Sequence, residues 1–249
     1  MAETDYDVYV MTVSERWGFV AFAAVAIFVV AYIFYHSVVL ALIFLPLALL
    51  YPKIKMKDII KKRKNILNLQ FKDMLYSLSS SVSAGKSVEM AFSDALKDLS
   101  IIYPDHDSYI ISETEYIVGK IAMNCTVEAA LRDFADRARL EDVSNFVDVF
   151  ATCKRTGGNM VEIIRNTANI INEKIETKQE IDVVLAEKAF EQKVLSILPV
   201  VLIVILSTAS GDYMQPVFER PIGKVVMTVS VGLLVLAYYL SKKVMDIKI

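Results

Sequence analysis

The sequence contains few of the residues that build disulfide frameworks or metal centres. Among its 249 residues are two cysteines, Cys125 and Cys153, and two histidines, His36 and His106. A metal site needs several convergent ligands. His106 with its two flanking aspartates offers at most a weak cation site, and the segment after Pro104 reads more simply as a turn and a helix start. We therefore expect no metal and no cofactor. Both cysteines fall within the stretch 53–193, which we predict to be cytosolic, where thiols stay reduced, so no disulfide is expected either.

The chain also lacks an excess of charge of either sign, with a formal net charge of -2. Its basic residues gather beside apolar segments and do not alternate with aromatic residues, as they do on nucleic-acid-binding surfaces. Alternation of apolar and polar residues typical of strands is missing over any useful length. These absences argue against a nucleic-acid partner and favour an all-α fold.

Charged residues are missing altogether from three long stretches, residues 17–52, 194–211 and 225–241. Hydrophobic residues make up 55% of the chain and the mean hydropathy is +0.45, which predicts that these stretches lie in a membrane. Ion-coupled carriers usually place ionisable residues within their spans, so the uncharged stretches disfavour such transport.

The first uncharged stretch is too long for one straight span. Its 36 residues would rise about 54 Å as a helix, whereas a hydrocarbon core is about 30 Å thick. We predict two spans, about 17–35 and 38–51, separated at the polar cluster from Tyr35 to Ser37. The alternative is one long tilted helix, which would place the N-terminus on the opposite side. The acidic segment 1–16 has no cleavage pattern, so the first span is expected to remain attached.

Lysines and arginines predict the orientation. Seven basic residues lie between positions 53 and 64, and such clusters are retained in the cytosol. We therefore predict a cytosolic domain over 53–193. A second membrane hairpin follows over 194–241, with spans at about 194–211 and 222–241 and an outward loop at 212–221. Residues 242–249 form a cytosolic tail, which makes this a multi-pass protein of the cytoplasmic membrane.

Within 53–193 the apolar residues recur at helical spacing, which predicts an antiparallel bundle of helices. The faces begin at Phe71, Val88, Ile110, Val127 and Val143, and a further long helix after residue 159 runs toward the membrane. Helix starts are marked by Ser87, Thr126 and Asn159, each followed by a glutamate in the first turn.

No motif predicts catalysis. Gly85, Lys86 and Ser87 resemble the end of a phosphate-binding loop, but Ser80 stands where that motif needs its first glycine, and no strand precedes it. A helix turn followed by an N-cap is the better interpretation. We therefore expect a protein that is not an enzyme.

Three strings resemble the TadB-like platform proteins of Tad (Flp) pilus assembly, which belong to the type II secretion system F domain superfamily. They are FKDML to SAGKSVEMAF over 71–92, RTGGNM over 155–160 followed by Glu162, and DYMQPVF with PIG over 212–223. The resemblance implies a non-enzymatic platform of a type IV pilus biogenesis or protein secretion machine. Its partners would be a cytosolic assembly ATPase, a sister TadC-like platform protein and pilin subunits, within an oligomer.

Other identities remain open. A TadC-like sister and a type II secretion F protein are the nearest, although the latter usually carries the cytosolic domain twice. From other classes, a small membrane transporter or channel with a cytosolic regulatory domain, or a membrane enzyme, is possible. Candidate partner-contact or structural-turn residues, chosen because helix ends expose charge, are Gly85, Lys86, Glu89, Arg155, Gly157, Gly158, Asn159 and Glu162.

Overall fold

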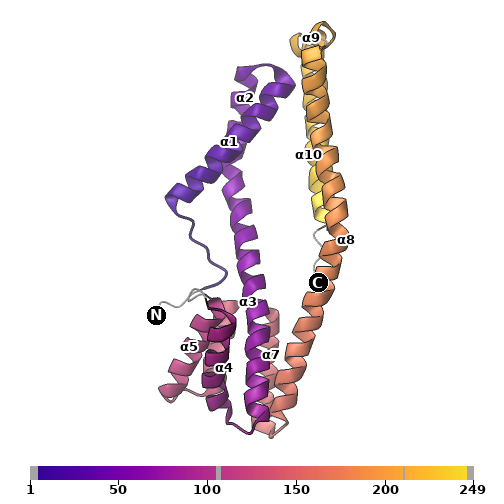
Figure 1. Ribbon diagram of the computed structural model, residues 1–249. Coiled ribbons are helices and arrows are strands. Elements are labelled where there is room, and N and C mark those ends of the chain that lie inside the picture. The colour runs from indigo at the N-terminus through magenta and orange to yellow at the C-terminus, as the bar shows by residue number, and fades with distance from the viewer. Residues whose placement is uncertain (1–4, 105–107, 210, 246–249) are drawn as a thin grey trace. The chain divides into compact units, whose positions relative to one another are not determined.

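Every regular element of the described chain is a helix, as the sequence predicts (Figure 1). The computed structural model describes residues 5–104, 108–209 and 211–245, and for residues 211–213, 219, 242 and 245 it describes the backbone alone. His106 therefore lies outside the described residues. The helices are α1 (Val13–Tyr35), α2 (Val38–Phe44), the 3-10 helix η1 (Leu45–Leu50), α3 (Tyr51–Ser83), α4 (Val88–Ile102), α5 (Tyr109–Ala122), α6 (Val127–Ala138), α7 (Glu141–Thr156), α8 (Met160–Ala209), α9 (Gly211–Glu219) and α10 (Pro221–Met245).

The chain divides into two compact units. The first, here called the bundle, contains Lys57–Thr177 together with the N-terminal residues up to Val10. The second, the apolar unit, contains Met11–Met56 and the chain from Lys178 onward. The sequence predicted domain boundaries at 53 and 193; α3 begins at Tyr51, just before the first of these positions, and α8 runs through the second. A helix that continues keeps its backbone hydrogen bonds. The residues along it can therefore change from polar to apolar at a position where the helix itself does not end.

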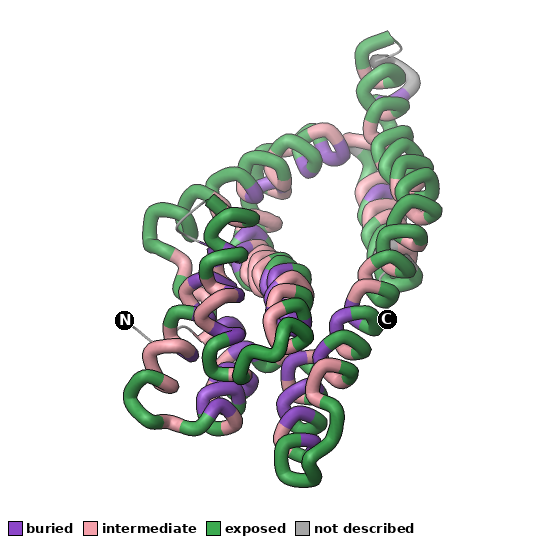
Figure 2. The backbone as a smooth tube through the Cα atoms, turned by 60° about the horizontal axis from the view of Figure 1, so that its bottom comes forward, coloured by how far each residue is buried: buried purple, intermediate pink, exposed green. Residues whose placement is uncertain are grey.

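The core of the bundle is built from the apolar faces that the sequence predicts (Figure 2). Phe71 of α3 is fully buried, and its ring centroid lies 5.9 Å from that of Phe134 and 5.7 Å from that of Phe146. The other fully buried large side chains include Leu75, Leu78, Phe92, Leu99, Ile110 and Phe150. Each such side chain contributes about 1.5–3 kcal/mol through burial, which makes this core the main source of the bundle's stability.

The three predicted helix caps are confirmed. Ser87 accepts a hydrogen bond from the Met90 amide and Thr126 from the Ala129 amide, both at 3.3 Å. Asn159 accepts from the amide of Glu162 at 3.3 Å. A cap of this kind stabilises a helix by about 1 kcal/mol.

Neighbouring helices of the bundle alternate in direction, so its turns gather at two ends. One end, here called the turn end, holds the turns at 84–86, 123–126 and 157–159. Side chains link them: Lys154 Nζ lies 2.9 Å from Glu128 Oε2, and Arg165 donates to Ser83 at 3.4 Å. The opposite end, the entry end, is where α3 enters the bundle and where α4 and α6 finish.

The apolar unit contains segments of the four helices that are long and apolar enough to cross a membrane. The four are Val13–Tyr35, Val38–Ser83, Met160–Ala209 and Pro221–Ser241. The first ends at His36, a residue with φ of 44° in the left-handed region, and the next begins at Val38. This break falls at the polar cluster where the sequence predicted one.

The segment predicted as an outward loop is largely helical, which corrects that prediction. It forms α9, and α9 ends just before Pro221, which begins α10. A proline disfavours the helical conformation of the residue before it, so α9 stops there while Pro221 suits a first helical position. Within the apolar unit, Met214 of α9 is buried with Phe34, Tyr35 and Met227.

Gly223 permits the close approach of α10 to α9. A Cβ atom at this position would lie 2.3 Å from the Val217 carbonyl oxygen, a contact that requires the backbone to move. We expect Gly223→Ala to destabilise the apolar unit by about 1–3 kcal/mol, the usual cost of overpacking. Gly232→Ala is the matched control, because Gly232 lies in the same helix with no atom within 4 Å of the added Cβ. Thermal melting in detergent should fall only for Gly223→Ala; equal melting of the two variants would contradict the contact.

Candidate functional site

The turn end brings together all the candidate residues that the sequence singled out. Gly85 has φ of +84° in the turn between α3 and α4, and Gly157 has φ of +74° at the end of α7. Glutamates 89 and 162 occupy the first turns of α4 and α8, and Arg155 the last turn of α7. A third turn, at 123–126, shares this end and was not among the predicted candidates.

Several candidates have structural partners of their own. Lys86 forms an ion pair with Asp94, and its hydrogen bond holds the pKa of the Asp94 carboxyl below the usual value. Asn159 and Glu162 interact with each other in the cap of α8. Glu89 and Arg155 are both exposed, which leaves them better placed to contact a partner.

A shallow depression opens beside the turn between α7 and α8. It has a volume of about 380 Å³ and is lined by Asp148, Val149, Thr152, Cys153, Thr156, Gly158 and Ile163. Asp148 is paired with Arg132 at 2.6 Å, and most of the other lining side chains are apolar or hydroxyl-bearing. Within the described residues, no group of three His, Cys, Asp or Glu side chains could hold a metal ion.

The turn requires glycine at positions 157 and 158 for two different reasons, and mutations can test the two reasons separately. Gly157 needs its positive φ, whereas a Cβ at Gly158 would lie 2.9 Å from Cys153 Sγ. We expect alanine at Gly157 to cost about 1 kcal/mol through backbone strain, and valine at either position to cost more. Gly119→Ala is the control, because Gly119 lies in a helix with open space around it. If the melting temperature of the bundle were unchanged in both turn variants, the turn would not need glycine.

The N-terminal residues contribute a second site, which sequence reasoning missed. Residues 5–10, here called the strap, belong to the bundle, although the sequence predicted 1–16 as a separate segment. Tyr6 is 1% exposed and packs edge-on against Tyr109, with ring centroids 5.7 Å apart. Its amide donates to the Arg137 carbonyl oxygen at 3.2 Å. The strap is therefore held by its backbone as well as by its side chains.

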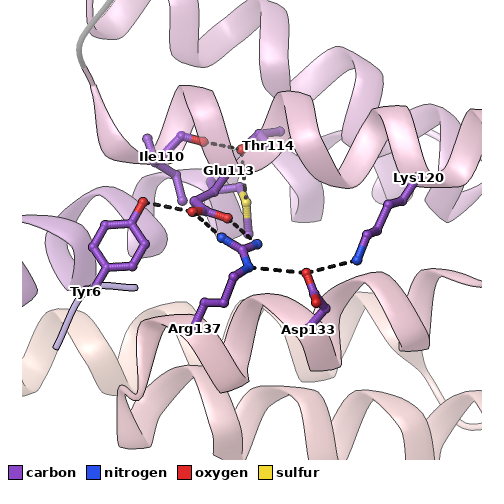
Figure 3. Close-up of polar contacts among 8 residues, drawn as sticks. Tyr6, Ile110, Glu113, Thr114, Lys120, Asp133 and Arg137 are labelled. Carbon is purple, nitrogen blue, oxygen red and sulfur yellow. Dashed lines mark hydrogen bonds and ion pairs between the residues drawn. The ribbon is translucent and has the colours of Figure 1, made fainter. Parts of the chain in front are cut away.

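The Tyr6 hydroxyl reaches a buried ion pair between α5 and α6 (Figure 3). It donates to Glu113 Oε1 at 2.8 Å. Arg137 Nη1 donates to the same oxygen at 2.6 Å, and Nη2 lies 2.6 Å from Glu113 Oε2. Glu113 is only 3% exposed, so these partners are what make a buried carboxylate tolerable.

The network continues along the same two helices. Asp133 lies 3.2 Å from Arg137 Nε and 3.0 Å from Lys120 Nζ, while Tyr116 places its ring under both cations. Burial alone would raise the pKa of Asp133, but the hydrogen bonds and charges of Lys120 and Arg137 lower it below the usual value. Burial and then the charge of Glu113 raise the pKa of Tyr6 well above its ordinary value.

Acidic residues of the strap meet basic residues of the bundle. Asp7 forms an ion pair with Lys64, whose hydrogen bond lowers the pKa of the Asp7 carboxyl. Arg139 lies 3.3 Å from Asp7 and 3.4 Å from Asp5. The only sequence signal for this docking is the acidic, aromatic composition of the strap, because its partners are more than 50 residues away.

Removing the Tyr6 hydroxyl should loosen the strap. We expect Tyr6→Phe to cost about 1.5–3 kcal/mol, because the buried Glu113 loses a hydrogen bond to a charged group. The raised pKa means that the neutral phenol is favoured in the fold, so its contribution is present below pH 10 and is lost as the pH rises through the folded pKa.

Hydrogen exchange of the α5 and α6 amides between pH 8 and 11 measures both effects. The wild-type chain should lose more protection with rising pH than Tyr6→Phe does, since the variant lacks the titrating group. Tyr76→Phe is the control, because Tyr76 is exposed and its hydroxyl bonds Asn169 instead. An equal loss of protection with rising pH in the wild-type chain, in Tyr6→Phe and in Tyr76→Phe would contradict the role of Tyr6.

Comparison with protein-family models, with curated proteins and with solved structures finds no match to this chain. The class of protein is therefore defined by its own structure. It is an all-helical chain in which a bundle is continuous with helices apolar enough to cross a membrane several times.

Proposed function

We propose that this chain is a non-enzymatic membrane platform whose bundle receives force from a cytosolic partner and passes it to the membrane helices. The observation that carries the proposal is the continuity of α8. Its 50 residues rise about 75 Å, of which a membrane core of about 30 Å holds less than half. A single helix thus belongs to both units, and its part before Pro199 joins the bundle to the apolar stretch along which displacement would pass.

The strap supports a hairpin for the first two spans. Tyr6 is buried in the bundle, which supports an arrangement with the strap and the bundle on the same side of the membrane. The chain between them, residues 11–56, then crosses the membrane an even number of times. This favours two spans over the single tilted helix, and the lysines after residue 52 support a cytosolic location for both ends.

Labelling of single cysteines tests this topology. In a chain with Cys125→Ser and Cys153→Ala, we expect an impermeant reagent added outside the cell to modify Tyr213→Cys but neither Val8→Cys nor Lys97→Cys. Val8 and Lys97 have exposed side chains, so protection would reflect the membrane and not burial. Modification of position 8 without position 97 would support the single-span alternative.

The resemblance to TadB-like platforms supplies the proposed setting, a Tad (Flp) pilus machine in the cytoplasmic membrane. There the chain would form an oligomer with a TadC-like sister and move pilin subunits as an assembly ATPase turns over. A transporter or channel with a regulatory domain is the alternative. Solute flux through liposomes containing the purified chain would favour it, whereas loss of filaments on deletion would favour the platform.

The turn end is the proposed contact for the ATPase, with Glu89 and Arg155 as its most available charges. We expect Glu89→Lys with Arg155→Glu to weaken recovery of the ATPase in a pull-down, at under about 1 kcal/mol for each exposed charge. The control is Glu115→Lys, which reverses an exposed charge along α5. Replacing residues 53–193 with a flexible linker should abolish recovery; full recovery would move the contact to another subunit.

A further inference from the structure

The strap docks on a defined set of bundle residues, here called the strap seat. Asp5, Tyr6, Asp7 and Tyr9 all contact the bundle, and residues 5–10 lie outside any helix. The seat is built from α3, α5 and the end of α6, and its residues are Arg63, Lys64, Tyr109, Glu113, Arg137 and Arg139. A short segment without regular structure is thus held by side chains from three helices.

The strap seat recognises two tyrosines and two acids in a fixed order. Tyr6 is the buried one, and its hydroxyl donates to the carboxylate of Glu113. Arg63 lies over the rings of both Tyr9 and Tyr109, 5.3 Å and 5.7 Å from their centroids, so each ring attracts the guanidinium. Val8, between the two tyrosines of the strap, is 55% exposed. The matching pattern is therefore acid, tyrosine, acid, any residue, tyrosine.

The buried charges of the seat stay paired when the strap is absent. Glu113 and Arg137 contact each other through both carboxylate oxygens at 2.6 Å (Figure 3). Arg137 is held on its other side by Asp133. Tyr6 adds a hydrogen bond to this pair, but the pair does not need Tyr6 to be formed. The strap can therefore leave and bind again without any helix of the bundle being taken apart.

Arg139 occupies a backbone position that usually favours glycine. It follows the end of α6 with φ of 46°, in the left-handed region, whereas the chain has Gly157 at the corresponding end of α7. A bulky side chain in this conformation costs strain, and strain that persists points to a use of the side chain. The guanidinium of Arg139 reaches Asp5 and Asp7 of the strap. Holding the strap is the use that these contacts indicate.

The strap and its seat are joined only through a long intervening part of the chain. Residues 11–56 lie between the strap and the rest of the bundle, and they belong to the apolar unit. The same side-chain contacts can therefore form whether the strap and the seat come from one copy or from two. Exchange of an identical segment between copies costs little, because each contact that is lost is formed again. An oligomer also keeps neighbouring straps at a high effective concentration.

We propose that the strap of one copy occupies the strap seat of a second copy. The second copy then supplies the tyrosine that bonds Glu113 and the aspartates that pair with Lys64 and Arg139. This inference rests on the oligomer of the proposed function. A second copy is favoured over another protein because it carries the whole acid and tyrosine pattern that the seat matches.

Carbodiimide cross-linking of two co-expressed variants tests the exchange. The reagent joins a carboxylate to a contacting amine with loss of water, so the Asp7–Lys64 ion pair reports a docked strap. One copy carries Lys64→Gln and the other Asp7→Asn, each with its own tag. A 7–64 amide can then form only between copies, and mass spectrometry of digested, cross-linked membranes identifies it. The wild-type chain shows that the cross-link forms at all.

The matched control uses an ion pair that lies between two helices of one bundle. Asp142 of α7 lies 2.6 Å from Lys174 of α8. Copies with Asp142→Asn and with Lys174→Gln, expressed together, should give no 142–174 amide, although the wild-type chain gives one. A 142–174 amide between these copies would show that whole helices exchange and would overturn an exchange confined to the strap.

We expect the first pair of variants to give the 7–64 amide between copies. Tyr6→Ala in the copy that keeps Asp7 should lower its yield more than about tenfold, because burial and a hydrogen bond to a charged group are both lost. A 7–64 amide in the wild-type chain but not between the two variants would show that each strap stays on its own bundle. That result would overturn the exchange and leave the platform proposal, which filament loss tests, standing. No 7–64 amide in either case would overturn the docked strap as well.

Arg139→Gly separates strap binding from the stability of the bundle. We expect it to lower the yield of the amide between copies about fivefold, equivalent to ~1 kcal/mol for an exposed charge. The melting temperature should stay the same or rise, since glycine relieves the strain at this position. Arg139→Ala should lower the yield equally without raising the melting temperature. An unchanged yield in both variants would contradict the place of Arg139 in the strap seat.

Discussion

The proposed membrane location imposes one constraint on the rest of the structure: in lipid, each backbone N–H and C=O group must find its hydrogen-bond partner within the protein. Hydrocarbon offers no partner for an amide or a carbonyl group, so a chain crosses a bilayer as a helix. In α8 the helix does not end where the composition becomes polar but runs from the bundle into the apolar stretch, whereas α3 begins at Tyr51, directly after the first apolar stretch. Residues such as Ile164 and Ala168 then bury one face of α8 in the bundle core. In the proposed function, anchoring and transmission would thus fall to the same helix.

The strap adds a third connection between the units, and its chemistry differs from that of the helices. A buried ion pair costs desolvation and seldom adds net stability, but it penalises any arrangement that leaves one charge unpaired. Tyr6 and Arg137 both donate to Glu113 Oε1, so docking of the strap adds a hydrogen bond to the buried carboxylate. The pair therefore defines where the strap docks on the bundle.

The features that the sequence predicted correctly are those that depend on residues close to one another along the chain. The periodic faces starting at Phe71 and Val127 and the caps at Ser87 and Thr126 are where the structure has them, because helix period and N-capping depend on residues three or four apart. Tyr6 could not be predicted, since its partners are fixed only when α5 and α6 pack. The helix α9 was missed because residues 212–221 lie between two uncharged stretches and were interpreted as the loop that joins them.

The central proposal is that α8 remains one unbroken helix across residue 177, where the bundle ends. Spin labels at Asn166 and Glu187, both exposed and 21 positions apart, span the boundary at residue 177. An unbroken helix separates their backbones by about 32 Å. Pulsed electron resonance on the reconstituted chain should give a single narrow distance distribution near that value. A broad distribution, or one centred at a much shorter distance, would show a hinge at the boundary and contradict the coupling.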